Sequence, residues 1–233
     1  MQRALSRPGT IAVATLGSFL LIVAIWWIRT TSAPTRPNDS QHVAPPHAVP
    51  QQQPWTYGRI SARFTIVEYA DLECPFCRAY FPVLRQWIEQ HPDANWQWQH
   101  LPLSIHDPSA TQEARIAECV GEVRGNAAFW DTVAWIYQNT RGDGGGLPAN
   151  VRIPGTSPTV EKCLASSRPD TAIREQVKAA AKNEVAATPT LRLIDRQTGR
   201  TLTLYGPVEG DTLVSAIDLL VTPESAIQSR NDP

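Results

Sequence analysis

The spacing of apolar residues in the middle of the chain predicts a strand, a helix and a second strand. Residues Phe64–Tyr69 form a mostly apolar run, and residues 96–101 alternate in polarity, as in a half-buried strand. Between them, apolar residues recur at helical spacing from Cys74 to about Gln90, and His91-Pro92 ends this helix. The residues that share its apolar face are Phe81, Leu84, Trp87 and Ile88.

After this unit the pattern becomes helical and then returns to strands. Ser109 is placed to cap a helix with Glu113 in its first turn, and a run rich in glycine at 142–146 indicates a loop. Further elements are expected as helices around 129–137, 158–166, 169–184 and 209–221, and as strands at 190–195 and 200–205. The order β-α-β, helices, β-β-α predicts an α/β domain with a helical insertion at about 107–185.

The N-terminal part of the chain carries a membrane-spanning pattern. Residues Ile11–Ile28 contain no charge, and a helix of that length just crosses the hydrocarbon core. Arg3 and Arg7 precede it, so we expect a single-pass anchor at residues 1–30 with a cytoplasmic N-terminus. A cleavable signal peptide is the alternative, but Thr31-Ser32-Ala33 is followed by Pro34, which disfavours cleavage there.

Composition divides the rest of the chain into a linker, one domain and a tail. Residues 31–54 are rich in proline and glutamine and predict an extended linker. Residues 55–222 are enough for one domain with a full core, and residues 223–233 form a polar tail. The formal net charge of −1 gives no reason to expect nucleic acid as a partner.

The segment Cys74-Pro75-Phe76-Cys77 carries the chemistry. It stands where a strand leads into a helix, and the helix N-terminus favours a thiolate over a thiol. We therefore expect Cys74 to be the exposed nucleophile and Cys77 to be the buried thiol that resolves a mixed disulfide. A structural zinc site uses the same CxxC spacing and is the less favoured reading.

Two segments together resemble the DsbA family of disulfide oxidoreductases, which has the thioredoxin fold. They are Val67–Cys77, which includes the CxxC motif, and Ala187-Thr188-Pro189-Thr190. The resemblance covers about residues 56–222. It implies that Pro189 is cis and faces the CxxC motif, and that the backbone of Thr188 pairs with an extended substrate peptide. By resemblance the Thr188 hydroxyl is also a donor to a cysteine sulfur, and no cofactor or metal is expected.

Three residues near the cysteines are expected to tune the reaction. In the most oxidising relatives a histidine stands where this chain has Phe76, so Phe76 implies a less stabilised Cys74 thiolate. Glu73 is expected to oppose a second negative charge beside it. Glu68 either lies buried beneath Cys77, where it could accept that thiol's proton, or points to solvent on the other face of the strand.

Cys119 and Cys163 both fall in the helical insertion. If the CxxC pair closes locally, the simplest of the three connectivities joins these two in a structural disulfide. Two free buried cysteines, or a zinc site with Cys74 and Cys77, remain as alternatives.

The sequence thus favours a membrane-anchored oxidoreductase of the inner membrane, with its catalytic domain in the periplasm. It would introduce disulfides into exported, cysteine-containing proteins through Cys74 and Cys77, and by resemblance a membrane redox partner would reoxidise it. The alternative is a reductase or isomerase of the same fold, kept reduced by a membrane electron donor. A non-catalytic binding or chaperone module is a third reading, against which the retained cysteines argue.

Overall fold

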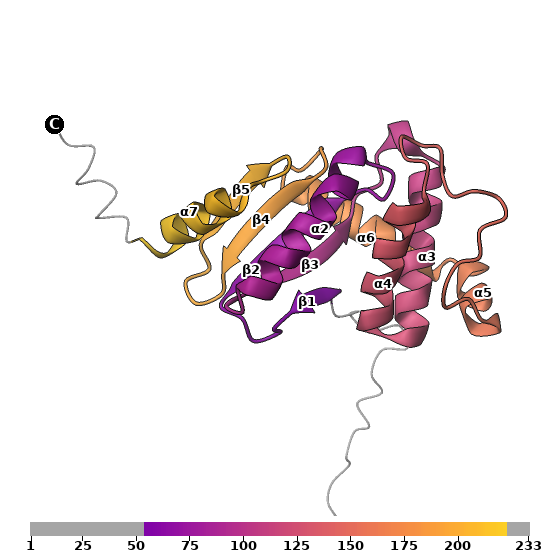
Figure 1. The fold of residues 1–233 in the computed structure, drawn as a ribbon, viewed down its shortest axis with the longest axis horizontal. Helices are drawn as coiled ribbons and strands as arrows, with labels where there is room; N and C mark the ends of the chain where they lie inside the picture. Colours follow the sequence, from indigo (N-terminus) through magenta and orange to yellow (C-terminus); the bar gives the residue numbers. More distant parts are fainter. Residues whose placement is uncertain (1–53, 223–233) are drawn as a thin grey trace, which may run out of the picture. The chain divides into compact units, whose positions relative to one another are not determined.

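A five-stranded sheet forms the centre of the domain in the computed structural model, which describes residues 54–222 (Figure 1). The strand order is β1-β3-β2-β4-β5. Strands β2 and β3 are parallel, and the other neighbours are antiparallel. The strands are β1 Thr56–Gly58, β2 Phe64–Ala70, β3 Ala94–His100, β4 Thr190–Asp195 and β5 Thr201–Tyr205. Because β2 is paired on both edges and covered on both faces, all its residues are buried.

Helices cover both faces of this sheet (Figure 1). Helices α2 and α7 pack on one face, whereas α6 packs on the other through a second apolar cluster around Val67 and Tyr69. The helices are α2 Pro75–Gln90, α3 Ser109–Arg124, α4 Asn126–Asn139, α5 Pro158–Leu164, α6 Arg168–Lys182 and α7 Gly210–Val221. A 3₁₀ turn, η1, spans Ser104–His106. The predicted order of strands and helices and the helical insertion are therefore confirmed.

Aromatic side chains join the sheet to the helical insertion. The rings of Trp96 on β3 and Trp130 on α4 lie 4.4 Å apart, and Trp55 stacks on Phe129 at 4.5 Å. Phe81 of α2 contacts the same group, with its ring 5.2 Å from that of Trp96. Large rings bury much apolar area, so this cluster holds α2, β3 and α4 in one continuous core.

The insertion has its own covalent brace. A disulfide joins Cys119 on α3 to Cys163 on α5, with their Cα atoms 5.6 Å apart and both residues fully buried. The predicted pairing of these two residues is thus present, and neither is available as a zinc ligand. Arg115 adds hydrogen bonds to the carbonyl of Leu164 and an ion pair to Asp170. The disulfide and the Leu164 contact fix the short helix α5 against α3, and the Asp170 ion pair ties α6 to α3.

Several local features differ from the sequence prediction. Pro108, not Ser109, is the N-cap of α3, and the Ser109 hydroxyl donates instead to the carbonyl of Gly144, 2.8 Å away. The cap prediction was wrong because the helix begins one residue earlier than a Ser109 cap requires, so Ser109 is its first helical residue and its Oγ is not placed to accept from a helix N–H. Strand β1 and turn η1 were not predicted, since three-residue elements carry no periodicity.

The predicted anchor, linker and tail lie outside the described residues. Within residues 54–222, no helix combines the length and the apolar character needed to cross a membrane.

Candidate active site

Helix α2 begins directly after Cys74, which is its N-cap residue. Pro75 occupies the first turn, where a missing N–H removes no helical hydrogen bond. Cys77 lies one turn further and is fully buried, as predicted for the second cysteine. Cys74, however, is only 4% exposed, so its expected exposure was wrong. It is covered because the loop containing Thr188 packs over its sulfur.

The two thiols have opposite electrostatic environments. A hydrogen bond from the Cys77 thiol is the main reason that the pKa of Cys74 falls to about 6, against the opposing effect of burial. Thr188 and the backbone N–H groups of Cys77 and Phe76 lower the pKa of Cys74 further. Burial raises the pKa of Cys77 well above its usual value, and Cys74 and Glu68 add to this. At neutral pH, Cys74 therefore carries the negative charge of the pair.

Thr188 and Pro189 reach the site from the start of β4. Their peptide bond is cis, as the resemblance implied, and the Thr188 carbonyl lies 3.6 Å from the Cys74 sulfur. The Thr188 hydroxyl forms no hydrogen bond within residues 54–222, so the expected bond to a cysteine sulfur is not made. The hydroxyl is still close enough to help lower the pKa of Cys74.

Glu68 lies buried below the cysteines on the central strand β2. Glu68 is 1% exposed, and this burial excludes the solvent-facing orientation that the sequence left open. Burial raises the pKa of Glu68 to about 8. The Trp96 indole faces the carboxyl and lowers this pKa a little, yet it does not reach Oε2, which has no hydrogen-bond partner among the described residues. No lysine of this part of the chain is among the groups that shift the pKa of Glu68.

Glu73, the residue before Cys74, is bound by the insertion. Its carboxylate accepts hydrogen bonds from the Thr140 hydroxyl and from the backbone N–H of Gly146, the latter at 2.9 Å. Although burial opposes it, these bonds lower the pKa of Glu73. We expected Glu73 to repel the Cys74 thiolate, but the main causes of the Cys74 shift do not include it. Its charge is instead stabilised by the donors Thr140 and Gly146.

Two further acidic groups near this segment were missed by sequence reasoning. Asp71 accepts hydrogen bonds from the ring of His106 at 2.7 Å and from the backbone N–H of Leu103 at 2.8 Å. Glu113, on α3, is buried, and burial, followed by a hydrogen bond to Glu73 and then the charge of Glu73, raises its pKa to about 9. The only signal in the sequence was the density of acidic residues before Cys74, which does not identify these partners.

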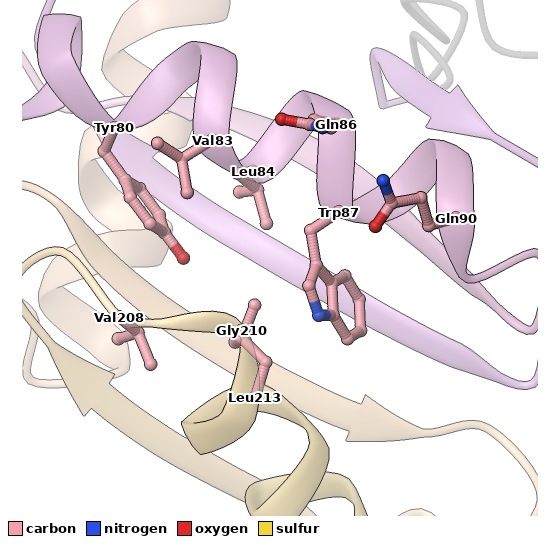
Figure 2. Close-up of a pocket in the computed structure, with 9 residues that line it drawn as sticks. All are labelled: Tyr80, Val83, Leu84, Gln86, Trp87, Gln90, Val208, Gly210 and Leu213. Carbon is pink, nitrogen blue, oxygen red and sulfur yellow. The ribbon is translucent and has the colours of Figure 1, made fainter.

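Beside the cysteines the surface is apolar. Phe76 is 62% exposed at the start of α2. A groove of about 230 Å³ runs between α2 and the segment that leads into α7, and Figure 2 shows its lining. The residues that line this groove are Tyr80, Val83, Leu84, Gln86, Trp87, Gln90, Val208, Gly210 and Leu213. A second hollow of about 270 Å³ shares Tyr80, Val83 and Val208 with it.

Comparison with known proteins gives a consistent answer. A family model described as Thioredoxin matches residues 51–218. The crystal structure of Pseudomonas aeruginosa DsbA2 is 43% identical, with a TM-score of 0.68, and the match covers 71% of this chain and 93% of that one. BdbD from Bacillus subtilis is 16% identical with a TM-score of 0.57, covering 71% and 91% of the two chains, and this likeness shows the fold alone.

Curated sequences add relatives of another architecture. The Na(+)/H(+) antiporter NhaA 3 of Salinispora tropica is 29% identical over 162 residues, which is 69% of this chain but 24% of that protein. The NhaA 1 protein of Salinispora arenicola is 30% identical over 138 residues, which is 57% of this chain and 20% of that protein. The chain thus spans about a quarter or less of these two antiporters. The match over residues 51–218 and the identity to DsbA2 place this chain in the thioredoxin family, among its DsbA-like thiol–disulfide oxidoreductases.

Proposed function

We propose that this protein is a disulfide oxidase, which introduces disulfides into exported proteins by exchange at Cys74 and Cys77. The observation that carries the proposal is the opposite shift of the two thiol pKa values, to about 6 for Cys74 and well upward for Cys77. With a pKa of about 6, roughly nine tenths of Cys74 is thiolate at pH 7. A stabilised thiolate favours the reduced enzyme, and this makes the oxidised form a stronger oxidant.

The exchange takes place in two steps. A substrate thiolate attacks Cys74 of the oxidised enzyme, forming a mixed disulfide while Cys77 leaves with the electron pair and takes up a proton. A second substrate thiolate then attacks the substrate sulfur, so that the substrate disulfide forms and Cys74 leaves as a thiolate. Because the pKa of Cys77 is raised, this thiol needs a proton source within the protein.

Glu68 is the proposed proton donor and acceptor for Cys77. Its charge contributes to the raised pKa of Cys77, which means that the two groups interact. A carboxyl with a pKa of about 8 is mostly protonated at pH 7 and can give its proton to the leaving Cys77 sulfur. When Cys77 attacks a mixed disulfide in the reverse direction or during reoxidation, the ionised carboxylate accepts the proton.

Substrate recognition is proposed to use the backbone of Thr188 and the apolar surface near Phe76. The Thr188 carbonyl faces the Cys74 sulfur, so an extended peptide that pairs with this loop would bring its cysteine to the reacting atom. The exposed ring of Phe76 and the groove beside α2 would contact apolar side chains of an unfolded substrate.

The cellular setting belongs to the same proposal. The uncharged run at Ile11–Ile28 supports a single-pass anchor in the inner membrane, with the catalytic domain in the periplasm. A membrane redox partner would then remove the electrons from the reduced Cys74–Cys77 pair. A reductase or isomerase that receives electrons from a membrane donor is the second candidate, because the exchange chemistry is reversible.

Trapping of mixed disulfides tests the two cysteine roles. Replacing Cys77 by serine removes the resolving thiol, so Cys77→Ser should accumulate mixed disulfides with exported proteins on non-reducing gels. Cys74→Ser should trap none, because it lacks the attackable sulfur. Equal trapping by both variants would sink this assignment of roles.

The reduction potential tests the direction. We expect a value between those of thioredoxin and the strongest family oxidant, at roughly −120 to −230 mV. Equilibration with glutathione buffers and quantification of free thiols gives this number. A potential at or below about −270 mV, where thioredoxin lies, would favour the reductase.

A further inference from the structure

Glu68 needs a route for protons to and from solvent, and this requirement rests on its proposed role above. A carboxyl with a pKa of about 8 is mostly protonated in neutral solution, so it must release a proton before it can accept one from Cys77. Yet Glu68 is only 1% exposed and stands on the central strand of the sheet. Direct exchange with bulk water is therefore blocked by the surrounding core.

Several buried polar atoms around Glu68 lack hydrogen-bond partners within residues 54–222, and three of them concern the proton route. They are Glu68 Oε2, the Tyr80 hydroxyl and Trp96 Nε1. Buried polar groups are nearly always satisfied by protein or by ordered water, so neighbouring unsatisfied atoms indicate a place where water enters. Burial and, after it, the charge of Glu68 raise the pKa of Tyr80, whereas the backbone of Val208 at the groove lowers it.

Tyr80 also belongs to the wall of the groove. It follows Cys77 by one turn on α2, and it lines both the groove of about 230 Å³ and the adjoining hollow of about 270 Å³. Figure 2 shows its hydroxyl directed into the space between α2 and the segment with Val208 and Gly210. Each hollow has room for several water molecules. Tyr80 thus interacts with Glu68 and lines the groove, while its hydroxyl is buried between them.

We propose that the Tyr80 hydroxyl, with water from the groove, connects Glu68 to solvent and carries the proton that Glu68 exchanges in each redox cycle. A phenol hydroxyl can do this without ionising, because it donates one hydrogen bond while it accepts another. The titratable groups that interact with Glu68 are Cys74 at the N-cap of α2, Cys77 and Tyr80 on α2, and Tyr137 on α4. Of these, Tyr80 is the one that lines the groove.

The test follows the step in which Cys77 must lose its proton. The reduced full chain is mixed in detergent micelles with oxidised glutathione and quenched with acid at intervals. Mass spectrometry then measures how fast the mixed disulfide at Cys74 closes to the Cys74–Cys77 disulfide. In Tyr80→Phe, which keeps the ring, we expect about tenfold slower closure at pH 6 and an unchanged rate at pH 9, where Glu68 is already ionised.

Two further variants separate the possible failures. Glu68→Gln should slow closure at every pH, and adding Tyr80→Phe to it should have no further effect, since both residues act in one path. Tyr57→Phe removes a hydroxyl that bonds to Glu89 at the surface and should match the wild type. A wild-type rate for Tyr80→Phe at all pH values, or equal slowing at pH 6 and pH 9, overturns the relay. A wild-type rate for Glu68→Gln overturns the role of Glu68 itself.

Discussion

At the scale of single residues, the start of α2 separates two thiols that are chemically alike. Cys74 receives hydrogen bonds from the second thiol and from backbone N–H groups, whereas Cys77 sits in the core above a carboxyl. The difference arises from one helical turn, because only the first residues of a helix face unpaired N–H groups. The separation of Cys74 and Cys77 by one helical turn is therefore enough to determine which sulfur attacks.

Phe76 offers the simplest way to change this balance. In Phe76→His a cationic imidazole near the sulfur should lower the pKa of Cys74 by about one unit, which corresponds to about 30 mV of more oxidising potential. The rate of alkylation by iodoacetamide as a function of pH measures the pKa, and glutathione equilibration measures the potential. Phe76→Leu, which adds no charge, is the control and should change neither value. A histidine variant with an unchanged potential would contradict this account.

Glu113 should make stability depend on pH. Its folded-state pKa of about 9 is above its usual value of 4.5, so the folded protein binds more protons than the unfolded chain between these pH values. Stability is then lost as the pH rises through this window. Relative to the wild type, Glu113→Gln, which cannot ionise, should gain up to about 4 kcal/mol of stability between pH 5 and pH 8.

Urea unfolding at the two pH values measures this difference. Glu175→Gln is a matched control, because Glu175 is an exposed residue that pairs with Lys178 at the surface. It should leave the pH dependence of the wild type unchanged. If Glu113→Gln lowers stability equally at pH 5 and pH 8, ionisation of Glu113 does not cause the pH dependence, and the inference is wrong.

At the scale of helices and strands, the insertion is held together by covalent and polar contacts. The disulfide between α3 and α5 closes a loop of 44 residues in the sequence. In the chain-entropy model, closure of such a loop stabilises the folded state by about 4 kcal/mol. Replacing both Cys119 and Cys163 by alanine should therefore lower the free energy of unfolding by up to about 4 kcal/mol.

This second disulfide should also resist reduction. Cys119 and Cys163 are fully buried between α3 and α5, whereas Cys74 stands at the start of α2 beside the exposed ring of Phe76. In a mild glutathione buffer, alkylation followed by mass spectrometry should label Cys74 and Cys77 while Cys119 and Cys163 stay unlabelled. Labelling of all four cysteines under the same conditions would show that the two disulfides are not distinct in function.

Sequence periodicity recovered the regular elements because burial repeats along them. The alternation of Trp96 and Trp98 with glutamines indicated β3, and the spacing of Phe81, Leu84 and Ile88 indicated α2. Contacts between distant segments were not recoverable in this way. The binding of Glu73 by Thr140 and Gly146 joins residues about 70 positions apart, and no local pattern encodes such a pair.

The active site shows the same division. The CxxC motif, the cis Thr188–Pro189 bond and the pairing of Cys119 with Cys163 could be inferred from residue types and a family resemblance. The burial of Cys74 and the choice between two orientations for Glu68 depended on which elements pack around them. Such packing is a property of the assembled fold, so it required the structure.

At the scale of the whole molecule, the redox state of the Cys74–Cys77 pair in cells distinguishes an oxidase from a reductase. A protein that is reoxidised by a membrane partner should hold its Cys74–Cys77 pair mainly as a disulfide in intact cells. Acid trapping followed by alkylation with a mass-shifting reagent measures the fraction. A mainly reduced pair would instead support the reductase candidate. Cys119–Cys163 should remain oxidised in either case, since it is buried in the insertion.

The binding of Glu73 by the glycine loop also sets a limit on engineering. A minimal enzyme made by deleting residues 107–185 would keep the strands, α2 and the CxxC motif. It would also lose the Thr140 and Gly146 donors that stabilise the Glu73 carboxylate next to the nucleophile, and the rings of Phe129 and Trp130 that complete the core. Removing these rings would expose the faces of Trp96 and Trp98 that they cover. The insertion is thus an integral part of the active site, and the domain cannot be shortened to its sheet and flanking helices without redesigning that site.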